Sequence, residues 1–317
     1  MKNKIIKLIN AADSIVILAH DNEDADAVGS CNAMKHALLT LGKSAVCIFS
    51  DTLEHRLGFM DEGYLVYDEK NTEYDLCICL DCADITRIGK RKVIFDNAKN
   101  TICIDHHITN KGFADINIID AKAPATGEIL YELFCDMGIE FNREIAKNLY
   151  AAISSDSGSF KYSNVRPKTL IIASELLKYD INHAEIARKL YDTETAEMMR
   201  FKGYLMNNVR QYAKGKINVV SASKELLAEY SVSDKDTGDI VNIPRMVEGC
   251  EIAISIREYS DKIKISFRSN GRYNVAEISA KIGGGGHEMA AGASVVGMTM
   301  DEVEKLVIKN CEEVING

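Results

Sequence analysis

The 317-residue sequence contains no apolar run long enough to cross a membrane. Its amino-terminal stretch, MKNKIIKLINAAD, has basic residues but neither a long apolar core nor a small-residue cleavage site, so it does not resemble a signal peptide. The stretch instead predicts an amphipathic helix with Ile5, Ile6, Leu8 and Ile9 on one face. These absences predict a cytoplasmic protein without a membrane partner.

Positive charge is also scarce. Lysine and arginine number 38 against 47 aspartates and glutamates, which gives a net charge of −9. Binding to long nucleic acid requires many neutralised phosphates, so this balance argues against long DNA as a partner. The negative net charge does not exclude a small phosphorylated substrate, because a few cations and metal ions in one cleft can outweigh the overall charge. The nine cysteines lack zinc-finger spacing and several lie inside apolar runs, which predicts buried, reduced thiols.

Length and composition, with 46% apolar and 27% charged residues, are typical of an ordinary soluble protein of two domains. In the first part of the chain, short apolar segments alternate with helix-like stretches, which predicts an α/β fold whose parallel sheet is covered on both faces. The expected strands are Ser14–Ala19, Ser44–Phe49, Tyr74–Leu80 and Ile102–Ile104, with a weaker one at Ala114–Ile119; the expected helices are Ala27–Leu41, Arg87–Ala98, Pro124–Met137 and Arg143–Ile153.

Polar side chains follow three of these strands. His20 follows the first, Asp81 the third, and Asp105, His106 and His107 the fourth. Because open α/β sheets place ligands at the carboxyl ends of their strands, we expect these side chains to lie together. A single His-His pair is more often a surface feature, but three strands that end in this way favour a site. Carboxylate and imidazole together suit a divalent metal ion.

Two further segments contribute candidate acids. The loop after the first strand holds Asp24 and Asp26; one of them could simply cap the next helix, but one cap does not explain four acids in seven residues. Asp156 lies in the stretch SSDSG, which an ordinary Asp/Ser/Gly turn would explain equally well. From Lys168 to about Tyr212 the sequence predicts helix throughout, and the methionine and aromatic stripe of Glu194–Arg210 predicts a packed interdomain helix.

A second domain is expected from about Gly215. The segments Glu251–Arg257 and Lys262–Arg268 alternate apolar and polar residues, which predicts an antiparallel hairpin with one solvent-facing side. Further on, four glycines (283–286) precede His287. We do not expect packing to require such a run; it would let backbone N–H groups approach an anion. Other expected elements are a strand at Ile217–Ser221 and helices at Lys224–Tyr230, Asp239–Val247 and Val275–Ile282.

Together these motifs resemble the DHH phosphoesterase superfamily. The order His20-x-x-x-Asp24-x-Asp26, DCAD, DHH and SSDSG matches its first domain, and Arg268-Ser269 followed by GGGGHEMAAG is similar to its DHH-associated domain. The resemblance implies an N-terminal parallel-sheet domain at residues 1–190, a helical linker at 191–214 and a smaller α/β domain with a mixed sheet at 215–317. The two-domain length is most similar to the bacterial oligoribonuclease and pAp phosphatase group.

The resemblance also implies a site with two Mn²⁺ ions, for which Mg²⁺ or Co²⁺ could substitute. His107 would polarise the phosphate or protonate a leaving group, and Asp105 would orient a histidine. The implied ligands are His20, Asp24 and Asp81 for one ion and Asp26, Asp81, His106 and Asp156 for the other, and the implied substrate-binding residues are Arg268, Ser269, Gly284, Gly285, Gly286 and His287.

Three positions depart from the family pattern. Glu23 stands where many relatives have proline, Asn274 where they often carry Asp, and Asp84 where Asn is usual. None of the three is an implied metal ligand, so these departures bear on substrate preference.

The implied activity is hydrolysis of short oligoribonucleotides and 3′-phosphoadenosine 5′-phosphate (pAp) by metal-activated water. A phosphodiesterase for cyclic di-AMP or its linear product pApA is the alternative enzyme. A catalytically silent nucleotide sensor is the alternative of another class, and the presence of all six ligands disfavours it. Two related enzymes are disfavoured. A family II pyrophosphatase would carry a lysine-rich phosphate motif in place of the glycine run, and a RecJ-type exonuclease would need further DNA-binding modules that 317 residues do not accommodate. The sequence leaves open the dominant substrate, the direction of digestion and the oligomeric state. A homodimer is one of the states that it leaves open.

Overall fold

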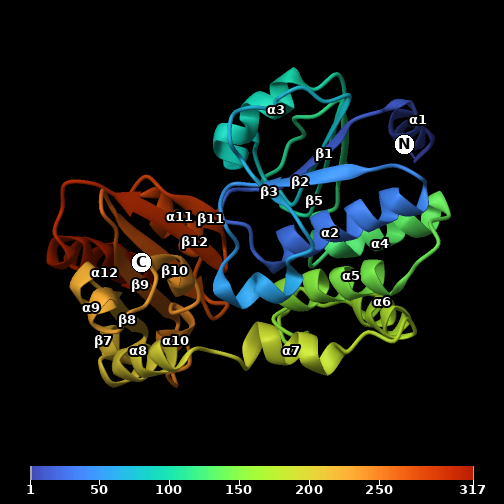
Figure 1. Ribbon diagram of the computed structural model, residues 1–317. Helices are drawn as coiled ribbons and strands as arrows, with labels where there is room; N and C mark the ends of the chain where they lie inside the picture. The colour runs from blue at the N-terminus through green and yellow to red at the C-terminus, as the bar shows by residue number, and fades with distance from the viewer. Residues whose placement is uncertain (1, 317) are drawn as a thin grey trace. The chain divides into compact units, whose positions relative to one another are not determined.

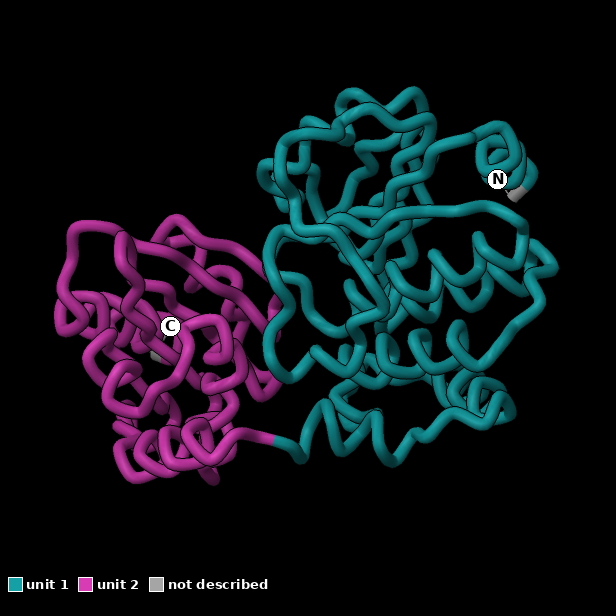
Figure 2. The backbone as a smooth tube through the Cα atoms, in the orientation of Figure 1, with its two compact units in different colours: residues 1–193 teal, residues 194–317 magenta. Residues whose placement is uncertain are grey.

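The computed structural model describes residues 2–316, which fall into two units, Met1–Thr193 and Glu194–Gly317 (Figure 2). The predicted linker at 191–214 spans this division. Among the described residues, no helix combines the length and the apolarity needed to cross a membrane. All cysteines in this range except Cys135 are buried, and all are free thiols, as the sequence predicts.

The first unit is built on a six-stranded parallel sheet in the order β3-β2-β1-β4-β5-β6. Figure 1 labels β1, β2, β3 and β5 of this sheet. The expected parallel sheet is therefore confirmed, and the weak strand β6 lies at its edge. Its members are β1 (Ile15–Leu18), β2 (Ala45–Phe49), β3 (Leu65–Val66), β4 (Leu76–Leu80), β5 (Thr101–Asp105) and β6 (Ile116–Ile119).

Both faces of this sheet are buried, because alternate strand residues pack into different clusters. Ile17 and Ile78 lie in a core with helices α1, α2, α4 and α5, whereas Val16 and Cys77 pack with Phe95 of α3 on the other face. The helices of the unit are α1 (Lys2–Ala11), α2 (Ala25–Thr40), α3 (Lys92–Asn97), α4 (Thr126–Met137), α5 (Arg143–Asp156), α6 (Pro167–Leu177) and α7 (His183–Tyr191), with 3₁₀ segments η1 (His55–Met60) and η2 (Ile85–Arg91).

Three expectations for this part of the chain need correction. The stretch expected as one helix at Arg87–Ala98 is the end of η2 followed by the short helix α3, and the helix is interrupted inside η2 at Gly89, whose φ is 55°. Asp156 is the last residue of α5 rather than part of a separate turn. The stretch Lys168–Tyr212 is not helical throughout, because β7 (Arg210–Tyr212) pairs with the following strand of the second unit.

The second unit contains a mixed sheet in the order β11-β12-β10-β9-β8-β7. Strands β8 and β9 are parallel and the other pairs are antiparallel, including the β9–β10 hairpin that the sequence predicts. The other strands are β8 (Ile217–Ala222), β9 (Ile252–Glu258), β10 (Ile263–Ser269), β11 (Gly285–His287) and β12 (Ala290–Val295); the helices are α8 (Ala196–Asn207), α9 (Lys224–Glu229), α10 (Asn242–Arg245), α11 (Val275–Ala280) and α12 (Met300–Asn316), with 3₁₀ segments η3 (Ala213–Gly215) and η4 (Asp234–Thr237).

Helices pack against both faces of this second sheet, but on the second face they leave part of β12 exposed. Ile254 and Phe267 pack with Val307 of α12 on one face. On the other face, Met198 and Phe201 of α8 pack with residues of β8, α9 and α10. Met198, Phe201 and Leu205 of the expected stripe thus pack within the second unit, whereas Met199, Tyr204 and Met206 are exposed. Packing accounts for one half of the stripe, and the expected interdomain role stays a prediction.

The glycine run differs from its expected form. Gly285–His287 is strand β11, which pairs with β12, and the amide of Gly284 donates to the Ser279 carbonyl at 2.9 Å. A Cβ at Gly284 would lie 2.3 Å from the Gly292 carbonyl oxygen, so packing does require glycine at this position. The sequence alone does not show which strand pairs with the glycine run, so this close contact could not be predicted.

Candidate metal centre

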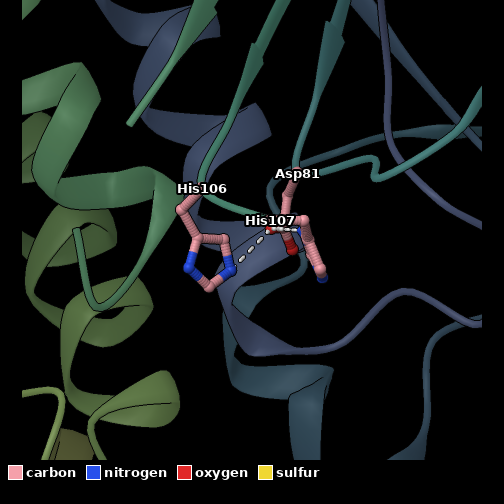
Figure 3. Close-up of side chains that lie close together, drawn as sticks. All are labelled: Asp81, His106 and His107. Atoms are coloured by element: carbon pink, nitrogen blue, oxygen red, sulfur yellow. Dashed lines mark ion pairs between the residues drawn. The ribbon is translucent and has the colours of Figure 1, made fainter. Parts of the chain in front are cut away.

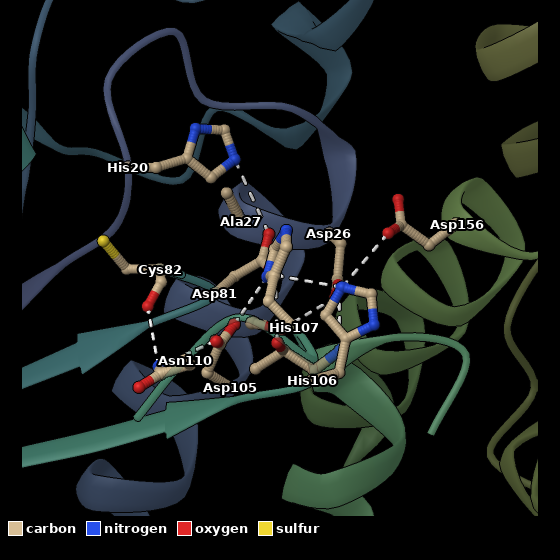
Figure 4. Close-up of polar contacts among 12 residues, drawn as sticks. His20, Asp26, Ala27, Asp81, Cys82, Asp105, His106, His107, Asn110 and Asp156 are labelled. Atoms are coloured by element: carbon tan, nitrogen blue, oxygen red, sulfur yellow. Dashed lines mark hydrogen bonds and ion pairs between the residues drawn. The ribbon is translucent and has the colours of Figure 1, made fainter. Parts of the chain in front are cut away.

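Three neighbouring strands deliver the predicted polar residues to one edge of the first sheet. His20 and Asp81 follow β1 and β4, and β5 ends in Asp105, directly before His106 and His107. Figure 4 shows these side chains pointing toward one another. Asp81 is held there with φ 53°, a backbone conformation that is uncommon and strained for a residue with a side chain. The sheet therefore gathers the residues as the strand pattern predicts.

His20, Asp24 and Asp81 form a first group of candidate ligands. The Nε2 atom of His20 lies 3.5 Å from Asp24 Oδ2 and 3.6 Å from Asp81 Oδ2. Its Nδ1 is 2.9 Å from the Asp21 carbonyl, which fixes the ring so that Nε2 faces the carboxylates. Asp24 also caps α2, because its Oδ1 accepts the amides of Asp26 and Ala27, both at 3.1 Å. Asp24 thus serves as a helix cap and as a candidate ligand.

Asp26, His106 and Asp156 form a second group beside the first. The Nε2 atom of His106 lies 3.4 Å from Asp81 Oδ1, 3.4 Å from Asp156 Oδ2 and 4.0 Å from Asp26 Oδ2. Within each group the possible ligand atoms lie within 4.8 Å of one another. Asp81 contributes one carboxylate oxygen toward His20 and the other toward His106. All six predicted metal ligands are therefore brought together, and their role as ligands stays a prediction.

His107 lies next to the same centre and has its own carboxylate partner. Its Nδ1 is 2.7 Å from Asp105 Oδ1 and 3.8 Å from Asp81 Oδ1 (Figure 3 shows Asp81 with both histidines). The expected contact between Asp105 and a histidine is thus present. Asp105 is itself fixed, because the side-chain amide of Asn110 donates to its Oδ2 at 2.8 Å and to the Cys82 carbonyl at 2.9 Å. Sequence reasoning missed Asn110, which follows His107 by three residues.

The first turn of α4 holds two candidate ligands from other segments. The amides of Thr126 and Gly127 donate to the Asp26 carboxylate at 2.7 and 3.1 Å. The Thr126 hydroxyl donates to Asp81 Oδ1 at 3.0 Å, and Ser30 donates to Asp26 at 3.0 Å. Sequence reasoning missed Thr126, because the partners lie 100 and 45 residues away and no motif marks them. These hydrogen bonds favour the charged form of both carboxylates and fix their orientation.

The electrostatics of the centre are those of crowded, desolvated carboxylates. Burial and the neighbouring carboxylates of Asp81 and Asp156 raise the pKa of Asp26 well above its ordinary value. Burial and the Asp24 carboxylate raise the pKa of Asp156 to about 7. Burial would also raise the pKa of Asp81, but its contacts with His106 and His20 outweigh burial and hold that pKa well below the ordinary value. Four carboxylates at this distance repel one another unless a positive charge lies among them.

One buried atom indicates where a cation fits. His106 Nε2 is buried and has no hydrogen-bond partner in the described part of the chain, although it faces carboxylate oxygens of Asp81 and Asp156. Buried polar atoms without partners are rare in native proteins. An imidazole nitrogen facing carboxylate oxygens is a donor set that suits a divalent ion such as Mn²⁺. The residues present therefore fit the two metal ions that the sequence implies.

The residues predicted to bind substrate lie in the second unit. Arg268 on β10 pairs with Ala290 on β12, which pairs in turn with His287 on β11. Residues opposite one another in antiparallel strands share a face, so Arg268 and His287 flank the small Ala290 on one side of the sheet. Ser269 is buried, and its hydroxyl oxygen accepts the Gly271 amide at 3.1 Å.

Comparisons with known proteins agree with this architecture. The model of the DHH family, N-terminal domain, matches residues 14–153, and that of the DHHA1 domain matches residues 215–316. The chain is 31% identical, over 299 residues, to the bifunctional oligoribonuclease and PAP phosphatase NrnA of Thermus thermophilus, which covers 94% of this chain and 89% of that protein. The chain belongs to the DHH family.

Two further similarities extend over almost the whole length of this DHH protein. The bifunctional oligoribonuclease and PAP phosphatase NrnA of Bacillus subtilis is 27% identical over 312 residues, covering 97% of this chain and 96% of that protein. An exopolyphosphatase-related protein from Bacteroides fragilis has a crystal structure that superposes with a TM-score of 0.92 at 29% identity, covering 98% of this chain and 95% of that one. The family resemblance found in the sequence is thus confirmed, and the chain is a phosphoesterase, a hydrolase.

Proposed function

We propose that this phosphoesterase hydrolyses short oligoribonucleotides and pAp, and that it requires two Mn²⁺ ions, for which Mg²⁺ or Co²⁺ can substitute. The observation that carries the proposal is the convergence of two histidines and four aspartates on one edge of the sheet, with the Asp81 carboxylate between the two groups. The choice of substrate is supported by the names of the relatives from Thermus thermophilus and Bacillus subtilis.

The ligands would divide as the two groups suggest. One ion would be held by His20, Asp24 and Asp81, and the other by Asp26, Asp81, His106 and Asp156. When bound, two divalent ions would lower the pKa of a water molecule and stabilise the charge on the phosphate oxygens. The chain itself contributes a rigid set of ligands, because Thr126, Gly127 and Ser30 orient the carboxylates that would bind. An anionic phosphate could not approach four carboxylates without such positive charge.

His107 would act directly on the substrate. Asp105 accepts the Nδ1 proton of His107, so the ring is held with Nε2 on the side away from that carboxylate. In its charged form His107 would donate the Nε2 proton to a phosphate oxygen or to the leaving oxygen. Asn110 would keep Asp105 in place through its contact with the other carboxylate oxygen.

The second unit would bind other groups of the substrate. Arg268 would pair with a phosphate in a charge-assisted contact, and His287 would add a donor from the neighbouring part of the same face. The backbone at Gly285 and Gly286 would allow a phosphate to approach closely. At Gly285 even an added Cβ would meet open space. The amides of Gly283 and Gly284 already donate to the carbonyls of Ala280 and Ser279 in α11, so they are not proposed as donors.

Overall charge supports a preference for short substrates. With a net charge of −9, the protein would gain no general attraction for a long polyanion, and each added nucleotide would add repulsion. A short nucleotide would need only the local contacts described above.

The experiment is a side-by-side measurement of kcat/KM with Mn²⁺ on pAp, pApA, cyclic di-AMP and RNAs of two to about twenty-five nucleotides at fixed salt. We expect turnover of pAp and the shortest RNAs, with a steep decline as length increases. An Asp156→Asn variant serves as the control for contaminating nucleases. A rate that stays flat or rises with length would contradict the proposal, as would turnover of cyclic di-AMP well above that of pAp and the short RNAs.

A further inference from the structure

Arg91 is a buried arginine whose donors are all used. It ends η2, its residue is 1% exposed, and none of the six candidate ligands contacts its guanidinium. A guanidinium has five N–H donors, and in Arg91 each donor has an acceptor. Nη1 donates to Glu23 Oε1 at 2.7 Å and to the Ile48 carbonyl at 2.8 Å, Nη2 to the Ala19 carbonyl and to Asp21 Oδ1, both at 2.9 Å, and Nε to the Ile88 carbonyl at 3.3 Å.

Three of these acceptors lie on or beside the loop that carries His20 and Asp24, two ligands of the first group. Ala19 directly precedes His20, and Glu23 directly precedes Asp24. Arg91 therefore connects the end of β1, the end of β2 and the loop between β1 and α2. Arg91 thus fixes the backbone carbonyl directly before His20 and the side-chain carboxylate directly before Asp24.

Other contacts press the same loop against η2. The amide of Asp21 donates to the Arg87 carbonyl at 2.6 Å, and the carbonyl of Asp21 contacts His20 Nδ1. A Cβ at Gly89 would lie 2.0 Å from Asp21 Oδ2, so η2 approaches the loop more closely than a side chain would allow. Glu23 is buried and also accepts the amide and hydroxyl of Ser50, at 2.7 and 2.9 Å. The loop is thus fixed from both sides.

The second group of ligands is held by different parts of the chain. Asp26 is oriented by Thr126, Gly127 and Ser30, and Asp156 is carried by the last turn of α5. Arg91 makes none of these contacts. Removing its hydrogen bonds should therefore disturb one group of ligands and leave the other in place.

We propose that Arg91 and Glu23 are a positioning pair that sets the affinity of the His20–Asp24–Asp81 group for a divalent ion, while the Asp26–His106–Asp156 group binds independently of them. The inference rests on the proposed two-ion function. It deepens that function by assigning the two ions different supports. Loss of a supporting hydrogen bond to metal ligands typically costs ten- to a hundredfold in metal affinity. Arg91 and Glu23 act one residue away from the ligands, so variants of the pair should bind one Mn²⁺ as tightly as before and the other about tenfold more weakly, at the lower end of this range.

Two variants test the pair with different severity. Arg91→Lys keeps the positive charge but has one nitrogen in place of three, so it cannot reach all five acceptors. Glu23→Gln is nearly isosteric and removes only the charge that faces Arg91. Its amide oxygen can still accept the Ser50 amide, and the Ser50 hydroxyl can turn to accept from the new NH2 group, so this variant should fold even if the arginine variant does not. The matched control is Glu62→Gln, which removes the charge from another largely buried pair of the same unit, with Lys147 at 2.7 Å. Glu62 lies with His36 and Glu144 in a separate polar cluster that shares no residue with the two ligand groups.

The measurement is Mn²⁺ titration of the full-length, chelator-treated protein by calorimetry, with electron paramagnetic resonance to distinguish a magnetically coupled Mn²⁺ pair from single ions. Wild type and Glu62→Gln should bind two equivalents and show the coupled signal. Glu23→Gln and Arg91→Lys should bind one equivalent tightly, and the coupled signal should appear only at higher Mn²⁺. Restoration of the full signal by excess Mn²⁺ would show that the ligands themselves are intact.

Three results would overturn the proposal. They are equal weakening of both equivalents, no weakening of either, and the same split in Glu62→Gln. A wild-type chain that binds fewer than two equivalents would instead contradict the proposed function itself. Thermal unfolding of each metal-free variant shows how much stability the substitution removes. Loss of stability alone should weaken both Mn²⁺-binding events, not one of them.

Discussion

The two sheets of this protein use their polar residues in different ways. In the first unit, strand ends place carboxylates and imidazoles in buried contact with one another, and no lysine or arginine pairs with Asp26, Asp81 or Asp156 among the described contacts. In the second unit, Arg268 and His287 lie on a sheet face where Gly292 and Ser294 are exposed. A parallel sheet collects residues from distant segments, whereas a hairpin arranges residues along one face. The first suits ions, and the second suits an anionic ligand.

The largest effect should come from Asp81→Ala, because this carboxylate belongs to both groups of ligands. Loss of even a supporting partner of a metal ligand costs roughly ten- to a hundredfold, so loss of Asp81 itself should exceed about a hundredfold in kcat. Turnover of pAp with saturating Mn²⁺ measures the effect, and circular dichroism checks the fold. Wild-type turnover in this variant would show that the first sheet does not hold the ions.

Arg268→Ala should separate the second unit from the first. Loss of a charge-assisted contact to phosphate costs about 1.5–3 kcal/mol, which corresponds to roughly ten- to a hundredfold in kcat/KM. Bound Mn²⁺ should be unchanged, as measured by metal analysis of the purified variant. The control is Arg272→Ala, an exposed arginine 3.5 Å from Glu251 in the same unit. Metal loss in Arg268→Ala would contradict a role limited to substrate.

Thr126→Val should have a smaller effect, confined to the first unit. The substitution removes the hydroxyl that donates to Asp81 and leaves the backbone amide that donates to Asp26. We expect Mn²⁺ affinity to fall about tenfold, at the lower end of the range for such supporting contacts. Thr126→Ser keeps the hydroxyl and should behave as wild type. Equal loss in both variants would assign the effect to packing of α4.

Glu62→Gln should change stability and leave activity unaltered. Burial opposes the charged form of Glu62, but contacts with His36, Lys147 and Asn148 outweigh it and lower its pKa to about 2 from an ordinary value of 4.5. Because the pKa of Glu62 is lower in the folded chain than in the unfolded chain, its carboxylate stabilises the fold at pH values above 4.5. This stabilisation is lost as the pH falls from 4.5 toward 2. The variant should be less stable by about 1–3 kcal/mol at neutral pH, and denaturant titrations at pH 7 and pH 3 should show the difference shrinking. A constant difference would assign the effect to packing.

The sequence predicted what depends on local pattern. The apolar runs that became β1, β4 and β5, and the polar residues that follow them, are local features that a parallel sheet brings together by its connectivity alone. The six candidate ligands were identified in this way and through the family motifs. The β9–β10 hairpin followed from the alternation of apolar and polar residues in the same manner.

Features set by packing between distant segments could not be predicted. The break at Gly89 is required by its approach to Asp21, and the structure of the glycine run is set by pairing with β12. The sequence analysis relates Glu23 only to substrate preference, yet this residue is buried against Arg91, 68 residues further along the chain. Thr126 and Asn110 carry no signature in one sequence. Thr126 orients the candidate ligands Asp26 and Asp81, and Asn110 orients Asp105. These supports of the centre were therefore missed, although the ligands themselves were found.

The most direct test of the account is the activity of chelator-treated protein as Mn²⁺ is returned in stoichiometric steps, with pAp as substrate and bound metal measured at each step. Because the Asp81 carboxylate lies between the two groups of ligands, we expect turnover to remain near the baseline until more than one equivalent is bound and to reach its plateau at two. Full turnover at one equivalent, or turnover that persists after chelation, would contradict the claim that the first sheet holds a working pair of ions.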